Sequence, residues 1–465
     1  MQHGCCVLPA DEAGRILDRL AGLEKIIQPE AVRQALNETG RQNRYDCVLT
    51  HEVTCWVVLA MGVLTNMPIR QVFKHARRLR ADEETPGRSA LCQARQRLGV
   101  EPLRQLFSQV VRPLATPEQT PEAFYHGWRL MGIDGTVLDV PDTPANAEAF
   151  GRPTAGSARG DGAFPQIRKV SLVELGTHVE VAFACQGVRS GGEQDAVPSL
   201  LDHLPPDSLL LEDRGFFSYP SWKRADGRGF RLLMRVRTAL ILEPIQHLGD
   251  DSFLAKIYPS PSCRDKDCDG IVVRVIRYTL DDGQRVGHQQ EHRLLTNLLD
   301  AKSYPARELI ALYHERWEEE LVFDEQKTHQ DPRRATKPAQ LRSQTPAGVE
   351  QELYALSMGH FVVRALMTEA AARVQVDPDR LSFTGCLHIL RCRLPECDSR
   401  TTVTLHRWYD ALLAEIARER TDPRRNRINP RVIKRKMSNW PKKRPQHRGP
   451  PPLLKTFAQS VVMLR

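Results

Sequence analysis

One segment free of proline and glycine, Ile310–Gln330, places four chemically different side chains at helical spacing. Its Glu, Leu, Lys and Arg content predicts a single continuous helix. At about 100° per residue, Tyr313, Arg316, Glu320 and Lys327 fall within about 60° of one another on one stripe of that helix. Amphipathic helices ordinarily place apolar residues on such a stripe. A carboxylate there can instead ligate a metal ion, and the neighbouring cations can bind phosphate oxygens.

The stripe also has a purely structural explanation. Arg316 and Glu320 form an i,i+4 pair, and such pairs commonly do no more than solvate a helix face. Asp324 lies on the same stripe and is an alternative ligand. Trp317 either stacks on a base or packs as a buried aromatic. Because short motifs recur by accident, the stripe alone leaves the function open.

Two upstream aspartates favour a functional interpretation. Asp134 lies in a predicted strand, Leu130–Val140, within the sequence Asp-Gly-Thr, where the glycine gives the backbone room for a ligand. Asp213 follows the predicted strand Leu209–Leu211 and precedes Arg-Gly, and open α/β sheets place ligands at strand ends. Each aspartate alone is more often a turn former. The weight rests on D-G-T, D-R-G-F and Y-x2-R-x3-E-x6-K occurring in this order.

The N-terminal quarter is predicted to be helical. After an apolar helix at Leu49–Leu64, short basic helices are expected at Ile69–Arg80 and Arg88–Leu98, on either side of a turn at Thr85–Gly87. This arrangement resembles a helix-turn-helix module that could enter a DNA groove. Charge alone does not distinguish such a module from a solvated helical bundle. The candidate DNA-binding residues are Arg88, Arg95 and Arg97.

From residue 129 the pattern changes to short, β-branched apolar runs. They predict a three-stranded meander followed by alternating helices and strands, which is a mixed α/β fold. Further helices are expected over residues 350–395 and Trp408–Arg418. The meander strands are Leu130–Val140, Lys169–Leu175 and Val179–Cys185. Later strands are expected at Leu209–Leu211, Phe230–Val236 and Leu294–Leu299. Helices are expected before the first of these strands, at Gln194–Leu204, and between the first two, at Phe217–Arg228.

The net charge of +9 favours a polyanionic partner. Much of it lies in Arg418–Arg448, which holds 13 lysines and arginines against two acids. Because this stretch is also rich in proline, we expect a tail that does not pack as a domain. Such a tail either binds nucleic acid phosphates without sequence preference or is simply solvated.

The cysteine pattern bears on location and on metals. The 11 scattered cysteines, with an N-terminus that lacks a secretory pattern and an apolar run, Cys55–Leu64, too short for a bilayer, predict a cytoplasmic protein with free thiols. Cys263-x4-Cys268 and Cys392-x4-Cys397 have the look of zinc half-sites. Neither has a nearby second pair, so unremarkable thiols are favoured.

Together these motifs resemble the DDE-type transposases of the insertion-sequence IS4 family. The resemblance covers most of the chain, including GRSALCQARQRLG and LSFTGCLHILR, and is strongest over Leu294–Thr328. It implies a ribonuclease-H-like core with a β-rich insertion, an N-terminal helical domain and C-terminal helices. It also implies Asp134, Asp213 and Glu320 as catalytic, metal-binding carboxylates, and Tyr313, Arg316 and Lys327 as DNA phosphate-binding residues.

The same resemblance implies a cofactor, partners and an activity. We expect two ions of Mg²⁺ or Mn²⁺, because carboxylate oxygens suit these metals. The expected partner is double-stranded DNA, as terminal inverted repeats and as target, bound by a homodimer in association with the bacterial nucleoid. The implied activity is metal-dependent strand cleavage and strand transfer in cut-and-paste transposition. An inactive DNA-binding regulator derived from a transposase is the alternative.

The expected domain organisation has six regions. They are an N-terminal helical, DNA-binding domain (1–118), a first part of the ribonuclease-H-like core (125–237), a β-rich insertion (238–292), a second part of the core with the catalytic helix (293–345), a C-terminal helical region (346–418) and a basic, proline-rich tail (419–465).

Overall fold

The chain is built as two compact units, each made from two separate stretches of sequence. The first unit combines Met1–Pro205 with Trp317–Thr421, and the second combines Pro206–Arg316 with Asp422–Arg465. This computed structural model describes residues 19–42, 47–76, 84–153, 162–283, 288–314, 316, 318–332, 341–397, 401–421 and 455–464, without the side chains of Glu318 and Glu319. The units are described one at a time.

Short helices open the first unit and confirm most of the predicted ones. The apolar run predicted to be a buried helix is α3 (His51–Val63), which is buried from Val53 onward. Its N-terminus is capped by the Thr50 hydroxyl, which accepts a hydrogen bond from the backbone N–H of Val53 at 3.1 Å. The other helices are α2 (Pro29–Glu38), α4 (Ile69–Ala76), α5 (Arg88–Leu98) and α6 (Glu101–Val110).

One N-terminal helix was predicted wrongly over the part that can be seen. The spacing of apolar residues in Ala13–Ile27 predicts a helix, but residues 19–27 form turns and the 3₁₀ turn η1 (Leu23–Lys25). Leu20, Leu23 and Ile27 are nevertheless buried. Turns can bury apolar side chains at the same spacing as a helix, so the pattern alone does not separate the two. Residues 1–18 lie outside the described part.

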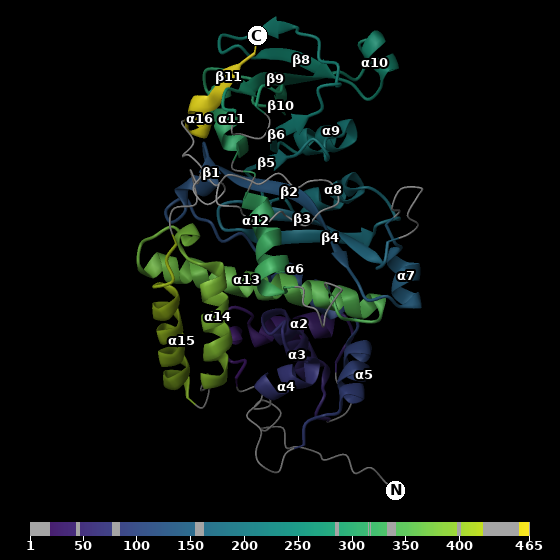
Figure 1. Ribbon diagram of the computed structural model, residues 1–465, viewed down its shortest axis with the longest axis vertical. Coiled ribbons are helices and arrows are strands. Elements are labelled where there is room, and N and C mark those ends of the chain that lie inside the picture. The colour runs from purple at the N-terminus through teal and green to yellow at the C-terminus, as the bar shows by residue number, and fades with distance from the viewer. Residues whose placement is uncertain are drawn as a thin grey trace. The chain divides into compact units, whose positions relative to one another are not determined.

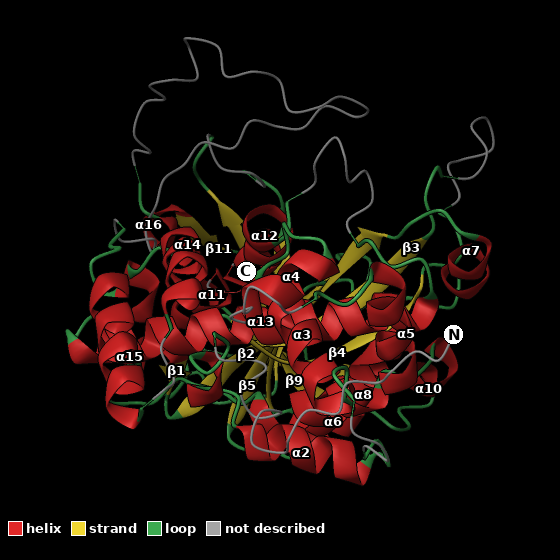
Figure 2. Ribbon diagram, turned by 90° about the horizontal axis from the view of Figure 1, so that it is seen from below, coloured by secondary structure: helices red, strands yellow, loops and turns green. Residues whose placement is uncertain are grey.

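Helix α13 (Pro346–Arg373) is the element on which the first unit is assembled. It packs against α3, α6, α14 and strand β4, so almost its whole surface is buried. Figures 1 and 2 both show α13 lying next to α3. At the crossing, Gly62 and Gly359 allow the two backbones to meet, since a Cβ on Gly62 would lie 1.8 Å from the carbonyl oxygen of Ala355. This contact fixes the N-terminal helices to the rest of the first unit.

The first unit's strands form the predicted antiparallel meander. β2 (Trp128–Asp139) pairs with β3 (Gln166–Glu174), which pairs with β4 (Val179–Gly187), and the short β1 (Phe124–Tyr125) adds to β2. The helix predicted over Gln194–Leu204 is broken into η3 (Glu193–Ala196), α8 (Val197–Leu200) and η4 (Leu201–His203). The other helices are α7 (Pro144–Phe150), α14 (Phe383–Arg393) and α15 (Thr402–Ile416). α14 falls within a predicted helical region, and α15 begins six residues before the predicted helix Trp408–Arg418.

The second unit is a mixed sheet. β5 (Ser208–Glu212) runs parallel to β6 (Arg231–Val236), and α9 (Tyr219–Gly227) connects them. β10 (His292–Thr296) is antiparallel to both β6 and β9 (Ile271–Leu280). The segment expected to be a β-rich insertion therefore continues this sheet directly. Its remaining elements are β7 (Gln246–His247), β8 (Phe253–Ile257) and α10 (Pro261–Asp265).

The end of the basic tail is packed, which corrects the expectation for this region. α16 (Phe457–Ser460) and β11 (Val461–Met463) belong to the second unit, and β11 pairs with β9 through Val462 opposite Thr279. The Phe457 ring stacks on His314, with ring centroids 4.0 Å apart. Residues 422–454, which carry most of the positive charge, lie outside the described part. Within the described ranges, no helix is long and apolar enough to cross a membrane.

The close approach of α3 and α13 yields a first prediction. We expect Gly62→Ala to lower the free energy of unfolding by about 1–3 kcal/mol, because the added methyl group meets backbone that cannot move aside. The measurement is the midpoint of urea unfolding. Gly227→Ala is the control, since a Cβ there meets no atom within 4 Å. Equal stability of the two variants would contradict the prediction.

Candidate active site

The segment Ile310–Gln330 was predicted to form a single continuous helix, and this prediction is wrong. The segment consists of α11 (Ala306–His314), α12 (Glu318–Asp324) and a π-helical turn, η6 (Glu325–Gln330). Arg316 lies between the two α-helices in a 3₁₀ turn. Tyr313 and Arg316 belong to the second unit, whereas Glu320 and Lys327 belong to the first. The four side chains therefore do not share one continuous helical stripe.

In the first unit, Asp134 lies in the middle of β2, opposite Ser171 of β3. Its side chain is half-buried, and its Oδ1 accepts a hydrogen bond from the backbone N–H of Gly135 at 2.8 Å. The Glu193 side chain fills the space beside Gly135, since a Cβ on Gly135 would lie 2.7 Å from Oε1 of Glu193. A carboxylate from η3 thus approaches the strand next to Asp134, a proximity that the sequence did not suggest.

Lys327 connects the π-helical turn to the same strand. Its ammonium group donates hydrogen bonds to the Thr136 hydroxyl at 2.8 Å and to the Val137 carbonyl oxygen at 3.1 Å. Helix α12, which carries the exposed Glu320, packs against β2. The Asp-Gly-Thr and Glu-x6-Lys motifs therefore meet in three dimensions, with Thr136 as a partner that its place in the motif could have indicated.

In the second unit, Asp213 follows β5 directly, as predicted. The buried hydroxyl of Tyr313 donates to the carbonyl oxygen of Glu212 at 3.2 Å and lies 3.4 Å from Oδ1 of Asp213. The Arg316 guanidinium lies 5.8 Å from the centroid of the Tyr313 ring, and both residues are buried. The Tyr313 hydroxyl thus contacts the end of β5, and its predicted contact with DNA phosphate stays a prediction.

Glu212, next to Asp213, has an unusual environment. Its side chain is fully buried, and neither carboxylate oxygen has a hydrogen-bond partner in the described structure. Burial raises the pKa of Glu212 to about 8, so the carboxyl group is mostly protonated at neutral pH. Sequence reasoning passed over this residue, because a glutamate at a strand end gives no signal of burial.

The basic residues predicted to bind DNA divide into two groups. Arg88 and Arg97 are exposed on α5. Arg95, however, donates to Gln351 Oε1 at 3.0 Å and to Ser343 Oγ and the Gly348 carbonyl oxygen, both at 3.1 Å. Burial lowers its pKa below the usual range. Arg95 therefore attaches α5 to α13, and we remove it from the candidate DNA-binding residues.

The donor chemistry bears on which metal the chain could hold. Carboxylate oxygens, as in Asp134 and Glu320, suit hard divalent cations such as Mg²⁺. Elsewhere, donor atoms of Cys263, Cys268 and Asp269 lie within 4.8 Å of one another. These three are one fewer than the four ligands that a structural zinc site requires. The carboxylate motifs of the sequence therefore favour a hard divalent cation, and the Cys263 cluster lacks the fourth ligand of a structural zinc site.

The raised pKa of Glu212 predicts how stability depends on pH. Because the folded-state pKa of about 8 lies above the ordinary glutamate value of 4.5, folding binds a proton and stability falls as pH rises between these values. We expect Glu212→Gln to flatten this decline, as measured by urea unfolding at pH 5 and pH 8. Glu308→Gln, on an exposed face of α11, should leave the wild-type slope in place. An unchanged slope in Glu212→Gln would contradict the burial argument.

Comparisons with known proteins agree with this geometry. Residues 17–108 match the insertion element 4 transposase N-terminal model, and residues 129–357 match the transposase DDE domain. The chain is 29% identical to the transposase InsG for insertion sequence element IS4 of Escherichia coli K12, over 91% of this chain and 93% of the relative. It is 33% identical to the putative transposase InsZ of the same strain, over 34% of this chain and 52% of the relative.

Among solved structures, a piggyBac transposase synaptic complex with hairpin DNA aligns with a TM-score of 0.42 and 12% identity, covering 90% of this chain and 88% of that one. The DDE-domain match agrees with the mixed α/β fold described above and with the ribonuclease-H-like core that the resemblance implied. The two family matches and the alignment with InsG along nearly the whole chain show that this chain belongs to the IS4 family of DDE transposases, enzymes that cleave and join DNA and depend on divalent metal ions.

Proposed function

We propose that this transposase binds the ends of its insertion sequence and moves it by cut-and-paste transposition, with Asp134, Asp213 and Glu320 as the catalytic carboxylates. The observation that carries the proposal is the contact of Lys327 with Thr136, which holds the turn after α12 against β2. Strand and helix thereby bring the Asp134 and Glu320 motifs into one region of the first unit. Asp213, at the end of β5, completes the set by its motif.

We further propose that the carboxylates take Mg²⁺ or Mn²⁺, as two ions. When bound, such ions supply Lewis-acid activation of the attacking oxygen and stabilise the leaving 3′ oxygen of an in-line displacement. A water first serves as nucleophile at the element end, and the 3′-hydroxyl that it releases then attacks a second phosphodiester. One site can serve both steps, because only the nucleophile differs.

The other residues of the motif would position DNA and carboxylates. Lys327 offers an ammonium group beside β2, where a point charge can bind a phosphate oxygen. Arg316 offers a guanidinium suited to bidentate phosphate contacts. Tyr313 holds the chain at Asp213 through its hydroxyl. These assignments predict that the three residues affect cleavage more than they affect the binding of element ends.

We propose double-stranded DNA as the partner of the exposed arginines of α5, with Arg88 and Arg97 contacting phosphates. The basic residues within 422–454 would add contacts without sequence preference. Joining two element ends requires two sites, so we propose a homodimer in the DNA complex. Terminal inverted repeats and target DNA would then be held in one assembly.

A matched pair of substitutions tests the metal-binding glutamate. We expect Glu320→Gln to abolish cleavage of element-end DNA in Mg²⁺ while end binding in a gel-shift assay is retained. Asp324→Asn, on the same helix, should cleave close to the wild-type rate, because the exposed Asp324 carboxylate pairs with His329 at 3.3 Å. The reverse result would make Asp324 the ligand. A wild type that binds ends but never cleaves would favour the inactive regulator.

The role of the exposed arginines of α5 is tested through the salt dependence of DNA binding. For Arg88→Ala with Arg97→Ala, we expect the slope of log affinity against log salt concentration to decrease by about 2, as each lost phosphate contact removes about 0.9. Arg95→Ala should instead lower the stability of the protein, since its guanidinium bonds hold α5 to α13. An unchanged salt slope in the double variant would exclude Arg88 and Arg97 from the DNA interface.

A further inference from the structure

The π-helical turn η6 directs polar side chains into the protein, where a surface helix would place apolar ones. Glu325, Gln326 and Gln330 are 3%, 2% and 0% exposed, whereas Lys327 points to β2 and Thr328 to solvent. π-helical turns are rare and occur frequently at functional sites. η6 follows directly after α12, the helix that carries Glu320. The contacts that hold η6 in place therefore help to determine where α12 lies.

Glu325 is held by an arginine and two histidines from two other elements. Arg364 of α13 binds it through two nitrogens, with Nε donating to Oε2 at 3.0 Å and Nη2 donating to Oε1. His360, one turn earlier on α13, contacts Oε2 through Nε2 at 2.9 Å. His178, from the turn between β3 and β4, contacts Oε1 through Nδ1 at 3.3 Å. Every one of these side chains is buried.

The second inward side chain, Gln326, joins a separate buried group. Its Oε1 accepts from the Lys169 ammonium at 3.1 Å, and its Nε2 donates to Oε2 of Glu180 at 3.1 Å. Lys169 also donates to Glu180 at 2.8 Å and to the Ser357 hydroxyl at 2.8 Å. Side chains from β3, β4 and α13 thus hold the turn through a second group of hydrogen bonds.

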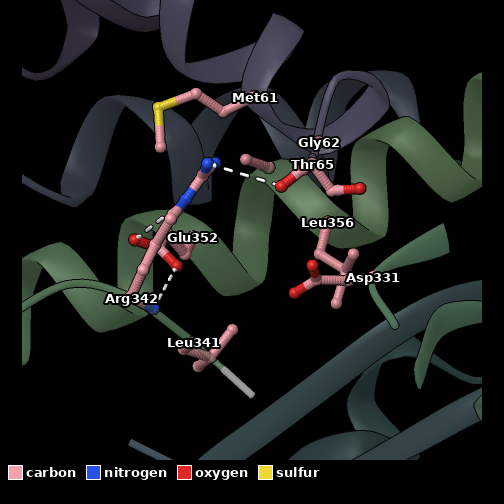
Figure 3. Close-up of a pocket in the computed structure, with 9 residues that line it drawn as sticks. Met61, Gly62, Thr65, Asp331, Leu341, Arg342, Glu352 and Leu356 are labelled. Carbon is pink, nitrogen blue, oxygen red and sulfur yellow. Dashed lines mark hydrogen bonds and ion pairs between the residues drawn. The ribbon is translucent and has the colours of Figure 1, made fainter. Parts of the chain in front are cut away.

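The third inward side chain, Gln330, closes the turn against the N-terminal helices. Its Nε2 donates to the carbonyl oxygens of Gly62 and Leu356, both at 2.8 Å. Its own carbonyl oxygen accepts from the Thr65 hydroxyl and from Nη2 of Arg391 at 3.0 Å. Figure 3 shows a small cavity lined by Thr65 and Asp331, in which Arg342 donates to the carbonyl oxygen of Thr65 and pairs with Glu352.

Stability alone does not explain this arrangement. Burying ions carries a desolvation cost, and well-packed apolar residues often stabilise a protein as well or better. What a bidentate ion pair adds is a fixed geometry. Although burial alone would raise the pKa of Glu325, Arg364 and His178 hold that pKa well below its usual range, so the carboxylate stays charged. The pair therefore fixes the turn in one orientation at working pH.

We propose that Glu325 is a positioning residue for transposition: anchored by Arg364 and His360, it sets the orientation in which α12 and η6 present Glu320 and Lys327 at β2. The proposal rests on the carboxylate assignment made above for Asp134 and Glu320. Glu325 does not touch DNA or metal in this account. It acts through the backbone of η6, so its loss should alter metal use and the chemical step before it alters end binding.

The test compares two equally buried carboxylates of the first unit. Glu325→Gln removes the charge under η6. Glu174→Gln removes a buried carboxylate that pairs with Arg129 and accepts from the Thr177 hydroxyl and from the backbone N–H of Leu114 at 2.8 Å, and none of whose hydrogen bonds in the described structure reaches η6. With Fe²⁺ in place of Mg²⁺, ascorbate and peroxide cut the backbone beside bound metal. We expect Glu325→Gln to raise the Fe²⁺ concentration for half-maximal cutting near Glu320 at least about tenfold, and Glu174→Gln to leave it unchanged.

DNA cleavage gives the second readout. We expect the single-turnover rate of Glu325→Gln to fall about a hundredfold with end binding retained, as displacement of a reacting group by about 1 Å does. If this variant does not fold, Glu325→Leu with Arg364→Met removes both charges together and should fold with the same defect. Equal effects in Glu325→Gln and Glu174→Gln, or none in either, would overturn the proposal. A wild type that is not cut near Asp134 or Glu320 would overturn the carboxylate assignment itself.

Discussion

The buried ion pair of Glu325 with Arg364 is the constraint around which the first unit is organised. A charge removed from water must be matched in position as well as in sign, because the interior does not reorganise around it as solvent does. Meeting that demand fixes α13, the turn between β3 and β4, and η6 at the same point. The Lys169–Glu180 pair and the Gln330 amide extend the same restriction to β3, β4 and α3.

Much of the fold could be predicted from local patterns, because burial imposes a period on the sequence. The apolar run that becomes α3 and the β-branched runs that become β2, β3 and β4 were identified for this reason. The order of the acidic motifs predicted Asp134, Asp213 and Glu320 as the candidate carboxylates. The contact of Lys327 with Thr136 shows that two of these motifs meet, although they lie far apart in the chain.

The remaining features depend on partners that no local pattern reveals. The break between α11 and α12 falls in a segment without proline or glycine, so the local sequence does not indicate it. Glu325 is followed by five more polar residues, Gln326–Gln330, and its burial is explained by its partners from α13 and the β3–β4 turn. Arg95 was predicted to contact DNA because its charge was visible and its three acceptors, more than 200 residues away, were not.

The packing of β11 has a consequence for the chain's behaviour in solution. β8 covers one edge of β9 over Ile271–Val275, and β11 covers the same edge over Tyr278–Leu280. Without its last residues, the chain would present an uncovered strand edge, with unpaired N–H and C=O groups able to accept a strand from another molecule. Pairing with β11 therefore covers an edge open to intermolecular pairing, in a part of the sequence whose composition predicted a tail that does not pack as a domain.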